Sequence, residues 1–200
     1  MDAKTQKSEM TRAAIVGAAL DLASAEGLEA ITLQAVADSL GLSKSGVFSR
    51  IGSREALQKA VIEEFGRRFV VDVFVPAMQA PKGLPRLNDI VQRWIVRTRD
   101  VEAHTGCIFS AGAFELDDRE GELRDMLHGE ITRWRASLRR TVMQAIEAGH
   151  LKADTDANQV VSELNALILG LLHDARFLRD SHAAERAQAT WQRLMKSYQA

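Results

Sequence analysis

Apolar residues recur along most of the chain at the three- to four-residue spacing of an α-helix. No stretch alternates apolar and polar residues in the way that predicts a half-buried β-strand. The three prolines, Pro76, Pro81 and Pro85, lie close together and interrupt the helical pattern only there. The pattern therefore predicts an all-α protein.

The first third of the chain is predicted to contain four helices, each of which begins at a residue with a hydroxyl side chain; a glycine follows each of the first three. A hydroxyl side chain suits the start of a helix because its oxygen accepts a hydrogen bond from a free backbone N–H group. The expected starts are Thr11, Thr32, Ser43 and Ser53. Gly27, Gly41 and Gly52 follow the first three apolar runs and suit the turns that end helices. The fourth helix is expected to run towards Pro76.

The rest of the chain predicts five more helices, which follow a linker from Pro76 to Pro85. They are expected near residues 86–103, 107–116, 119–148, 157–180 and 183–198. No internal repeat or low-complexity tract occurs in the sequence. The prediction is thus a chain of nine helices with one clear linker.

The composition is that of a folded protein, since 46% of the residues are hydrophobic. No stretch reaches the roughly 20 apolar residues of a membrane span. The first residues, MDAKTQKSEM, lack the apolar segment of a secretory signal. A single cysteine, Cys107, leaves no partner for an internal disulfide and no cysteine cluster for zinc. We therefore expect a cytoplasmic protein that has no membrane partner.

The overall charge gives no sign of a nucleic-acid partner, because 26 Lys and Arg residues balance 27 Asp and Glu residues. A role in DNA binding must therefore depend on a local patch. Such a patch occurs between Gly41 and Lys59, where Glu55 is the one acidic residue among several cations. These cations are Lys44, Arg50, Arg54 and Lys59. A patch of this size is also common on ordinary solvated surfaces, so its meaning depends on the fold around it.

The second and third predicted helices are short and are joined by a tight turn at Gly41, as in a helix-turn-helix. Ala37 is small where the two helices must approach, and the shared core is expected from Val36, Leu40, Leu42 and Val47. The exposed side of the third helix carries short polar and cationic groups suited to phosphates and base edges. These are Ser43, Lys44, Ser45, Ser49 and Arg50.

The run from Thr11 to about Phe65 resembles the N-terminal DNA-binding domain of the TetR family in the order and spacing of its residues. The features that carry the resemblance are Ala18-Ala19, Gly27, Thr32, Val36-Ala37, Gly41, Ser43 and the run Ser53-Arg54-Glu55-Ala56-Leu57. The resemblance implies a DNA-binding surface made of Thr32, Ser43, Lys44, Ser45, Gly46, Phe48, Ser49, Arg50 and Arg54.

Four positions depart from the family's pattern. Phe48, Arg50 and Ile51 stand where the family generally has tyrosine, histidine and phenylalanine, and Arg54 stands where lysine is usual. Phe48 lacks the hydroxyl that would contact a phosphate, whereas Arg50 offers a charge-assisted phosphate contact. Arg54 keeps a cation at the start of the fourth helix.

The resemblance also implies two domains and a function. Residues 1–52 would form a three-helix DNA-binding domain, and residues 53–200 a helical effector-binding and dimerisation domain. The function implied is a ligand-responsive regulator, by default a repressor, that binds a pseudo-palindromic DNA operator as a dimer. A small, mainly apolar or aromatic effector would release it.

Several residues of the second domain are candidates for the effector site that the resemblance implies. Most are aromatic or apolar, and His104, Thr98 or Arg97 would orient the effector. The candidate ligand-binding residues are Phe69, Trp94, His104, Cys107, Phe109, Phe114, Met126 and Trp134.

The apolar stripe near the C-terminus is wider than one core-facing helix side requires, so a second copy of the chain is expected to bury part of it. The last two helices would then form a four-helix arrangement across a two-fold axis. The candidate dimer residues are Val160, Leu164, Leu167, Ile168, Leu171 and Trp191.

Three other interpretations are weaker. His104 and Cys107 invite a nucleophile and base, but no third orienting group is apparent, so we expect no enzyme. The acidic run from Glu115 to Glu120 with His104 suggests a metal site, but it more simply caps the next helix, so no metal or cofactor is expected. A purely architectural DNA-bending protein would not require the long helical remainder.

Overall fold

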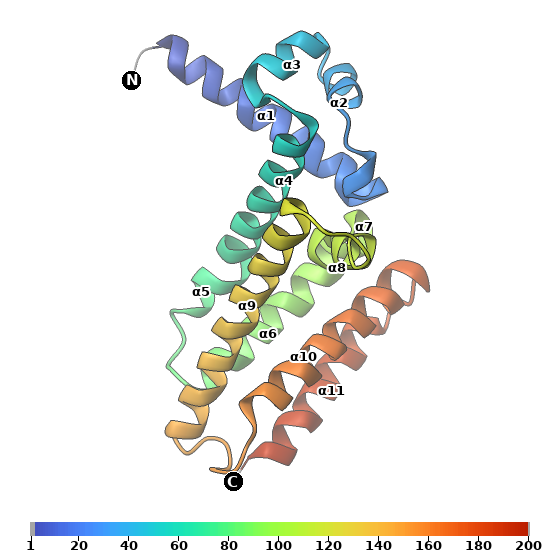
Figure 1. Cartoon of the computed structure of the whole chain (residues 1–200). Coiled ribbons are helices and arrows are strands. Elements are labelled where there is room, and N and C mark those ends of the chain that lie inside the picture. Colours follow the sequence, from blue (N-terminus) through green and yellow to red (C-terminus); the bar gives the residue numbers. More distant parts are fainter. Residues whose placement is uncertain (1–2, 200) are drawn as a thin grey trace. The chain divides into compact units, whose positions relative to one another are not determined.

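The computed structural model describes residues 3–199, and every regular element in that range is helical (Figure 1). The chain divides into two compact units. One comprises the residues up to Arg68 together with Cys107–Glu130, and the other comprises Phe69–Gly106 together with the residues from Ile131 onward. The first unit thus includes a segment from the middle of the chain, which differs from the expected single boundary after residue 52.

The first unit contains the predicted DNA-binding helices. Its elements are α1 (Ala3–Glu26), the 3-10 helix η1 (Leu28–Ala30), α2 (Leu33–Ser39), α3 (Lys44–Ile51), α4 (Arg54–Phe69), α8 (Ile108–Glu115) and the start of α9 (Glu122–Glu147). The prediction that the first helix begins at Thr11 is wrong, because the Thr11 hydroxyl donates to the Lys7 carbonyl oxygen (2.9 Å) inside α1.

The second unit contains the remaining helices. Its elements are the π-helical η2 (Val70–Phe74), α5 (Val75–Ala77), α6 (Leu84–Arg97), the π-helical η3 (Thr98–Glu102), α7 (Ala103–Thr105), the rest of α9, α10 (Ala157–Leu172), the π-helical η4 (His173–Phe177) and α11 (Ala183–Tyr198). Three α-helices, α4, α6 and α10, therefore continue directly into a π-helical segment. Apolar spacing does not distinguish these segments from α-helix, so the sequence predicted continuous helices there.

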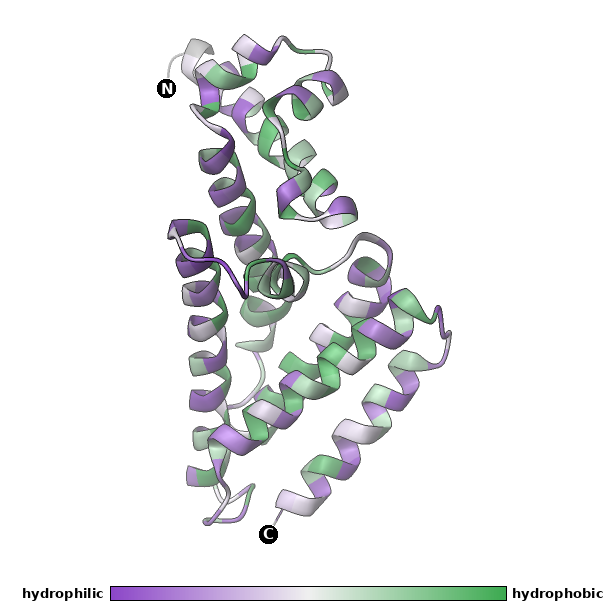
Figure 2. Cartoon of the chain, turned by 45° about the vertical axis from the view of Figure 1, so that its right-hand side comes forward, coloured by the Kyte–Doolittle hydropathy of each residue, from purple (hydrophilic) through white to green (hydrophobic). Residues whose placement is uncertain are grey.

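One hydrophobic cluster forms the core of the second unit and joins α6, α9, α10 and α11. Figure 2 shows hydrophobic residues along much of α10, in keeping with the burial of Val160, Leu164 and Ile168. Leu87, Ile90 and other buried residues of α6 pack in the same cluster. No helix among residues 3–199 is long and apolar enough to span a membrane.

Candidate DNA-binding interface

Side-chain caps and a glycine turn fix the α2–α3 pair. The Thr32 hydroxyl oxygen accepts a hydrogen bond from the Ala35 N–H (3.0 Å), and the Ser43 hydroxyl oxygen accepts one from the Gly46 N–H (3.0 Å). Gly41 has a φ of 62°, which a side chain would disfavour at the turn. Ser53 caps α4 in the same way, since its hydroxyl oxygen accepts from the Ala56 N–H (3.0 Å). The predicted starts at Thr32, Ser43 and Ser53 are therefore confirmed.

The outer face of α3 is polar and exposed. Val47 is completely buried against the rest of the first unit, while Lys44, Ser45, Ser49 and Arg50 lie on the exposed side. Because those four residues lie along one short helix, from its first turn to Arg50 in its last, they form a compact surface of hydroxyl and cationic groups. A surface of this chemistry suits the major groove of DNA.

Phe48 lies on the same exposed face of α3, and 57% of its surface remains exposed. The ring therefore adds little to the core of the first unit. Its position beside the exposed Lys44 and Ser49 is where van der Waals contact with a DNA backbone would be available, in place of a tyrosine hydroxyl bond.

The four cations of the predicted patch differ in their partners. Lys59 pairs with Glu55 (2.9 Å) and with Glu122. The hydrogen bond to Glu122 raises the pKa of Lys59, and the same bond lowers the pKa of Glu122. Lys44 and Arg50 have no carboxylate partner among residues 3–199, and Arg50 donates only to the Gly46 carbonyl oxygen (2.9 Å) and the Ser49 hydroxyl oxygen (3.5 Å). Of these four cations, the two on α3 are therefore the ones that no carboxylate of the described residues balances.

Arg54 is occupied within the protein. Its Nε donates to the Ile31 carbonyl oxygen (2.7 Å), and its Nη2 donates to the carbonyl oxygen of Glu29 (2.6 Å) and to the Glu29 carboxylate (3.2 Å). Burial alone would raise the pKa of Glu29, but Arg54 and Arg119 hold it below its usual value. Because these bonds tie the start of α4 to η1, the geometry favours a structural role for Arg54 over the expected phosphate contact.

A carboxylate that sequence reasoning missed holds η1 from the other side. Glu115, the last residue of α8, accepts hydrogen bonds from the Leu28 N–H (2.9 Å) and the Glu29 N–H (2.6 Å). Gly27 is required beside it, since its φ is 95° and a side-chain Cβ there would lie 3.1 Å from a Glu115 oxygen. The acidic run was interpreted as a cap for the following helix, whereas Glu115 caps a segment far away in the sequence.

The candidate effector residues do not form one cluster within a unit. Phe69, Trp94 and Trp134 meet in the second unit, with ring centroids 4.8 to 5.4 Å apart in edge-to-face geometry. His104 is exposed on α7 of the same unit. The other four belong to the first unit and are Cys107, Phe109, Phe114 and Met126. Of these, Phe109 packs edge-on against Phe65 (4.9 Å), while Phe114 is 71% exposed.

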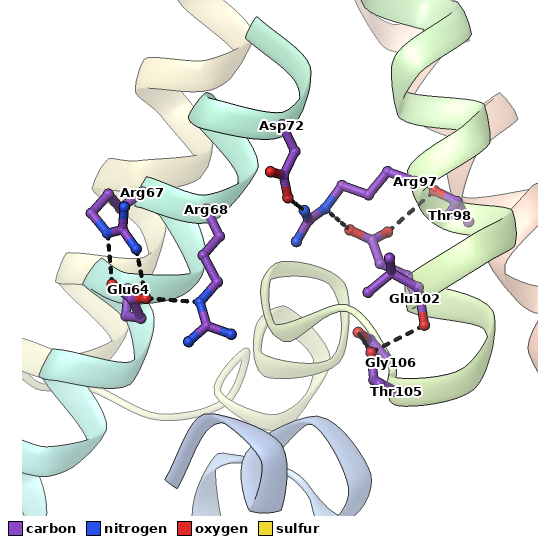
Figure 3. A network of polar contacts seen from close by, with 10 residues as sticks. Glu64, Arg67, Arg68, Asp72, Arg97, Thr98, Glu102, Thr105 and Gly106 are labelled. Atoms are coloured by element: carbon purple, nitrogen blue, oxygen red, sulfur yellow. Dashed lines mark hydrogen bonds and ion pairs between the residues drawn. The ribbon is translucent and has the colours of Figure 1, made fainter. Parts of the chain in front are cut away.

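An ionic network joins Asp72, Arg97, Thr98 and Glu102 in the second unit, and all but Asp72 are buried (Figure 3). The Arg97 Nε donates to a Glu102 oxygen (3.1 Å), and the Arg97 Nη1 pairs with Asp72. The Thr98 hydroxyl donates to the other Glu102 oxygen (3.2 Å). Arg97 also lies over the Phe69 ring, 5.6 Å from its centroid. Arg97 and Thr98, which were expected to orient an effector, are therefore engaged within the protein.

Most candidate dimer residues are already buried in their own unit. Those with 4% or less of their surface exposed are Val160, Leu164, Ile168, Leu171 and Trp191. Trp191 is further fixed by an Nε1 bond to the Asn88 side-chain oxygen (2.9 Å). Only Leu167 is partly exposed. The stripe is wide because α6, α9 and α11 cover it within one chain, so these five side chains have almost no surface to offer a second copy.

Two observations concern the residues of the alternative interpretations. Cys107 is buried and belongs to the first unit, whereas His104 belongs to the second. No group of three or more His, Cys, Asp or Glu residues in the described part of the chain is placed to hold a metal ion.

The capped helix pair with its exposed cationic face, followed by a separate helical unit, defines a helix-turn-helix DNA-binding protein with a second, all-helical domain. Residues 15–61 match the model of the bacterial regulatory proteins of the tetR family, and residues 83–191 match the tetracyclin repressor-like C-terminal domain. The chain therefore belongs to the TetR family of transcriptional regulators, which have a DNA-binding domain and a ligand-binding domain.

Solved structures share this fold over nearly the whole chain. A TetR-family regulator from Cytophaga hutchinsonii has 19% identity and a TM-score of 0.82, with 97% of each chain covered. A TetR regulator from Chloroflexus aurantiacus has 22% identity and a TM-score of 0.80, with 92% of this chain and 93% of that chain covered. AibR, solved with isovaleryl coenzyme A and operator DNA, has 16% identity and a TM-score of 0.71, with 90% and 95% covered. No curated protein matches the sequence significantly.

Proposed function

We propose that the protein is a repressor that binds a pseudo-palindromic operator as a homodimer in the bacterial cytoplasm and is released by a small effector, with no enzymatic activity. The observation that carries the DNA-binding part is the outer face of α3, where Lys44 and Arg50 have no carboxylate partner among the described residues. Unpaired cations keep their charge available for DNA phosphates.

The operator contacts follow from the exposed face of α3. Ser45 and Ser49 would reach base edges in the major groove, and Lys44 and Arg50 would contact phosphates with charge-assisted hydrogen bonds. Thr32 is exposed at the start of α2, where backbone N–H groups favour a second phosphate. Arg54 would act indirectly, because it holds η1 and the start of α4 in place.

The homodimer would use the outer side of α10 rather than its buried stripe. Ser162, Ala166 and Gly170 are exposed and follow one another at helical spacing, so a partner helix could approach closely there. A two-fold axis along this face would present two copies of α3 to successive major grooves, about 34 Å apart or a multiple of that spacing. An Ala166→Arg variant is expected to sediment as a monomer at micromolar concentration, while the control Ala136→Arg, at an exposed alanine of α9, stays dimeric.

The effector would bind at the aromatic cluster of Phe69, Trp94 and Trp134. Trp94 is 7% exposed, and the Nε1 atoms of Trp94 and Trp134 are buried without a hydrogen-bond acceptor among the described residues. A buried donor without an acceptor is unfavourable, so an effector with carbonyl or ether oxygens would gain affinity there. The effector is therefore proposed to be mainly apolar or aromatic and equipped with hydrogen-bond acceptors.

Coupling between the two sites would run through α4, which begins at Arg54 in the first unit and ends at Phe69 in the aromatic cluster. An effector releases DNA only if it binds the arrangement that cannot bind DNA more tightly. A coupling of about 1 to 3 kcal/mol would change operator affinity by about 5- to 150-fold. AibR, solved in complex with isovaleryl coenzyme A and operator DNA, is a protein of this fold that binds both kinds of ligand.

Selection of bound sequences from random duplex DNA tests the proposal. We expect enrichment of a pseudo-palindrome, followed by weaker binding of that duplex to Lys44→Ala but not to Lys82→Ala. Lys82 is a matched control because it is an exposed lysine of the second unit. Enrichment of no sequence, or equal loss in both variants, would exclude operator recognition by α3.

The effector part has its own test. The chain has three tryptophans, two of them in the aromatic cluster, so an effector should change the intrinsic fluorescence. Trp94→Phe should weaken its binding, whereas Trp191→Phe should not, because the Trp191 Nε1 already has an acceptor. By reciprocity, saturating operator must weaken effector binding by the same factor as the effector weakens operator binding. A compound bound equally with and without operator is not the effector.

A further inference from the structure

A hollow of about 1080 Å³ lies in the second unit, where η3, α7, η4 and the start of α11 meet. It belongs to neither the aromatic cluster nor the DNA-binding face. Its walls carry an excess of basic residues over acidic ones, since Asp180 is the one carboxylate among the lining residues. The basic lining residues are Arg99, His104, His173, Arg176 and Arg179.

The charges around the hollow are only partly balanced. Arg99 forms a two-point ion pair with Asp100 (2.5 and 2.9 Å), so its charge is neutralised locally. Asp180 is likewise occupied, because it pairs with Arg186 and accepts from the His182 N–H (2.8 Å). The acidic lining residue therefore does not neutralise the remaining arginines.

Arg176 and Arg179 keep an unbalanced positive charge. Neither side chain has a carboxylate partner within residues 3–199. Arg176 is half-buried and its Nη1 donates to the His104 carbonyl oxygen (2.8 Å), which holds the guanidinium in place beside the hollow. A guanidinium has five N–H donors, so this bond leaves others for a further acceptor. The forked geometry of those donors matches carboxylate and phosphate oxygens.

The N-terminus of α11 adds to the positive electrostatic potential of the hollow. Ala183 and Ala184, the first two residues of this helix, line the hollow; the His182 side chain makes no capping hydrogen bond, and Asp180 accepts the His182 N–H (2.8 Å). The backbone dipole of a helix favours negative charge at this end. The two arginines and the helix start thus act on the same volume.

Another part of the wall of the hollow is apolar rather than basic. Leu172, Ala175 and Phe177 line the hollow with apolar groups. Phe177 is 76% exposed, although its ring lies against the His173 ring with centroids 5.5 Å apart. An exposed aromatic ring beside unbalanced cations is suited to a ligand with both an apolar part and an anionic part.

Two of the wall segments, η3 and η4, are π-helical, and such segments occur frequently at functional sites. We propose that the hollow binds an amphiphilic anion, with a phosphate or carboxylate head on Arg176 and Arg179 and an apolar tail against Phe177 and Leu172. This site is separate from the effector site and does not depend on DNA binding.

Calorimetric titration of the full chain with octyl phosphate tests the proposal. We expect saturable binding that is about tenfold weaker in Arg176→Gln, equivalent to about 1.4 kcal/mol, and weaker also in Arg179→Gln. Arg140→Gln, which changes an exposed arginine on α9 away from the hollow, should bind like the unchanged chain. Circular dichroism should show the same helix content and melting temperature in all variants, so that lost binding reports on the site.

Further titrations test the anionic head and the apolar tail of the ligand separately and identify the source of the ligand. Inorganic phosphate alone should bind much more weakly than octyl phosphate, and Phe177→Ala should reduce only the octyl phosphate affinity. Vesicles with anionic lipid headgroups that compete with octyl phosphate would assign the head group to a membrane lipid, and vesicles that do not compete would assign it to a free metabolite. The proposal would be overturned if octyl phosphate did not bind, as expected if a second copy covers the hollow. It would also be overturned if octyl phosphate bound Arg176→Gln and the unchanged chain equally well.

Discussion

The charged side chains on α3 and those inside the second unit differ in their exposure and in their ion pairing. On α3, Lys44 and Arg50 are exposed and lack carboxylate partners among the described residues, so they contribute to the surface potential rather than to folding. In the second unit, Arg97 and Glu102 are 8% and 1% exposed and bind each other. The difference indicates that the first set is available to a partner molecule, whereas the second set is part of the folded core.

Removing a buried charge should have the largest effect on folding. Glu102→Ala leaves the Arg97 guanidinium buried with one carboxylate fewer and should lower the free energy of unfolding by about 3 to 5 kcal/mol. Urea denaturation followed by circular dichroism measures this. The exposed residue Glu147 provides the control, since Glu147→Ala should change stability by no more than about 0.5 kcal/mol. Equal losses in the two variants would show that the network is not structural.

Glu115 is an intermediate case, because it is half-buried and its oxygens accept backbone N–H groups rather than a cation. Glu115→Ala leaves two N–H groups of η1 without an acceptor and should cost about 1 to 3 kcal/mol of stability. Glu115→Gln should cost less, because its amide oxygen still accepts one bond. The exposed residue Glu120 is the control, and a loss in Glu120→Ala as large as that in Glu115→Ala would contradict the capping role.

Substitutions at Arg54 and Lys44 compare a cation that binds the protein with an exposed cation in the same unit. Arg54→Ala removes the bonds to Ile31 and Glu29 and should lower stability by about 1 kcal/mol, since the side chain is partly exposed. Lys44→Ala should leave stability unchanged, because the described structure gives this side chain no partner. A melting temperature that falls in Lys44→Ala but not in Arg54→Ala would contradict the structural role given to Arg54.

The smallest effect is expected from the ion pairs that Glu64, which is partly buried, makes with the exposed Arg67 and Arg68. Hydrogen bonds from Arg67, and then from Arg68, lower the pKa of Glu64 from 4.5 to about 2 (Figure 3). The folded chain then holds fewer protons than the unfolded chain between these values, so this contribution is present above pH 4.5 and is lost as the pH falls towards about 2. Glu64→Gln should make the melting temperature fall less steeply over that range. An unchanged pH profile would show that these ion pairs do not stabilise the fold.

Local signals in the sequence predicted the helix-turn-helix well. The hydroxyl caps at Thr32 and Ser43 and the turn at Gly41 depend on residues at most a few positions apart, so the sequence alone reveals them. The same reasoning did not predict the partners of Arg54 and Glu115. These residues bind backbone groups 23 and 87 positions away, and no local pattern marks such distant contacts.

The C-terminal stripe illustrates a second limit. Apolar spacing correctly predicted that Val160, Leu164 and Leu171 would be buried, but not what would cover them. A hydrophobic helix face is the same whether a neighbouring helix or a second chain packs on it. The expected assignment to a partner therefore differs from the structure, in which helices of the same unit cover these residues.

The salt dependence of DNA binding tests the central claim most directly. The affinity of a selected duplex should fall steeply with salt, and Lys44→Ala and Arg50→Ala should each reduce the slope of log affinity against log salt by about 0.9 for every phosphate contact removed. Lys59→Ala should leave the slope unchanged, because Glu55 and Glu122 already neutralise Lys59. A slope that changes in Lys59→Ala but not in the two α3 variants would contradict the proposal that α3 is the DNA-binding surface.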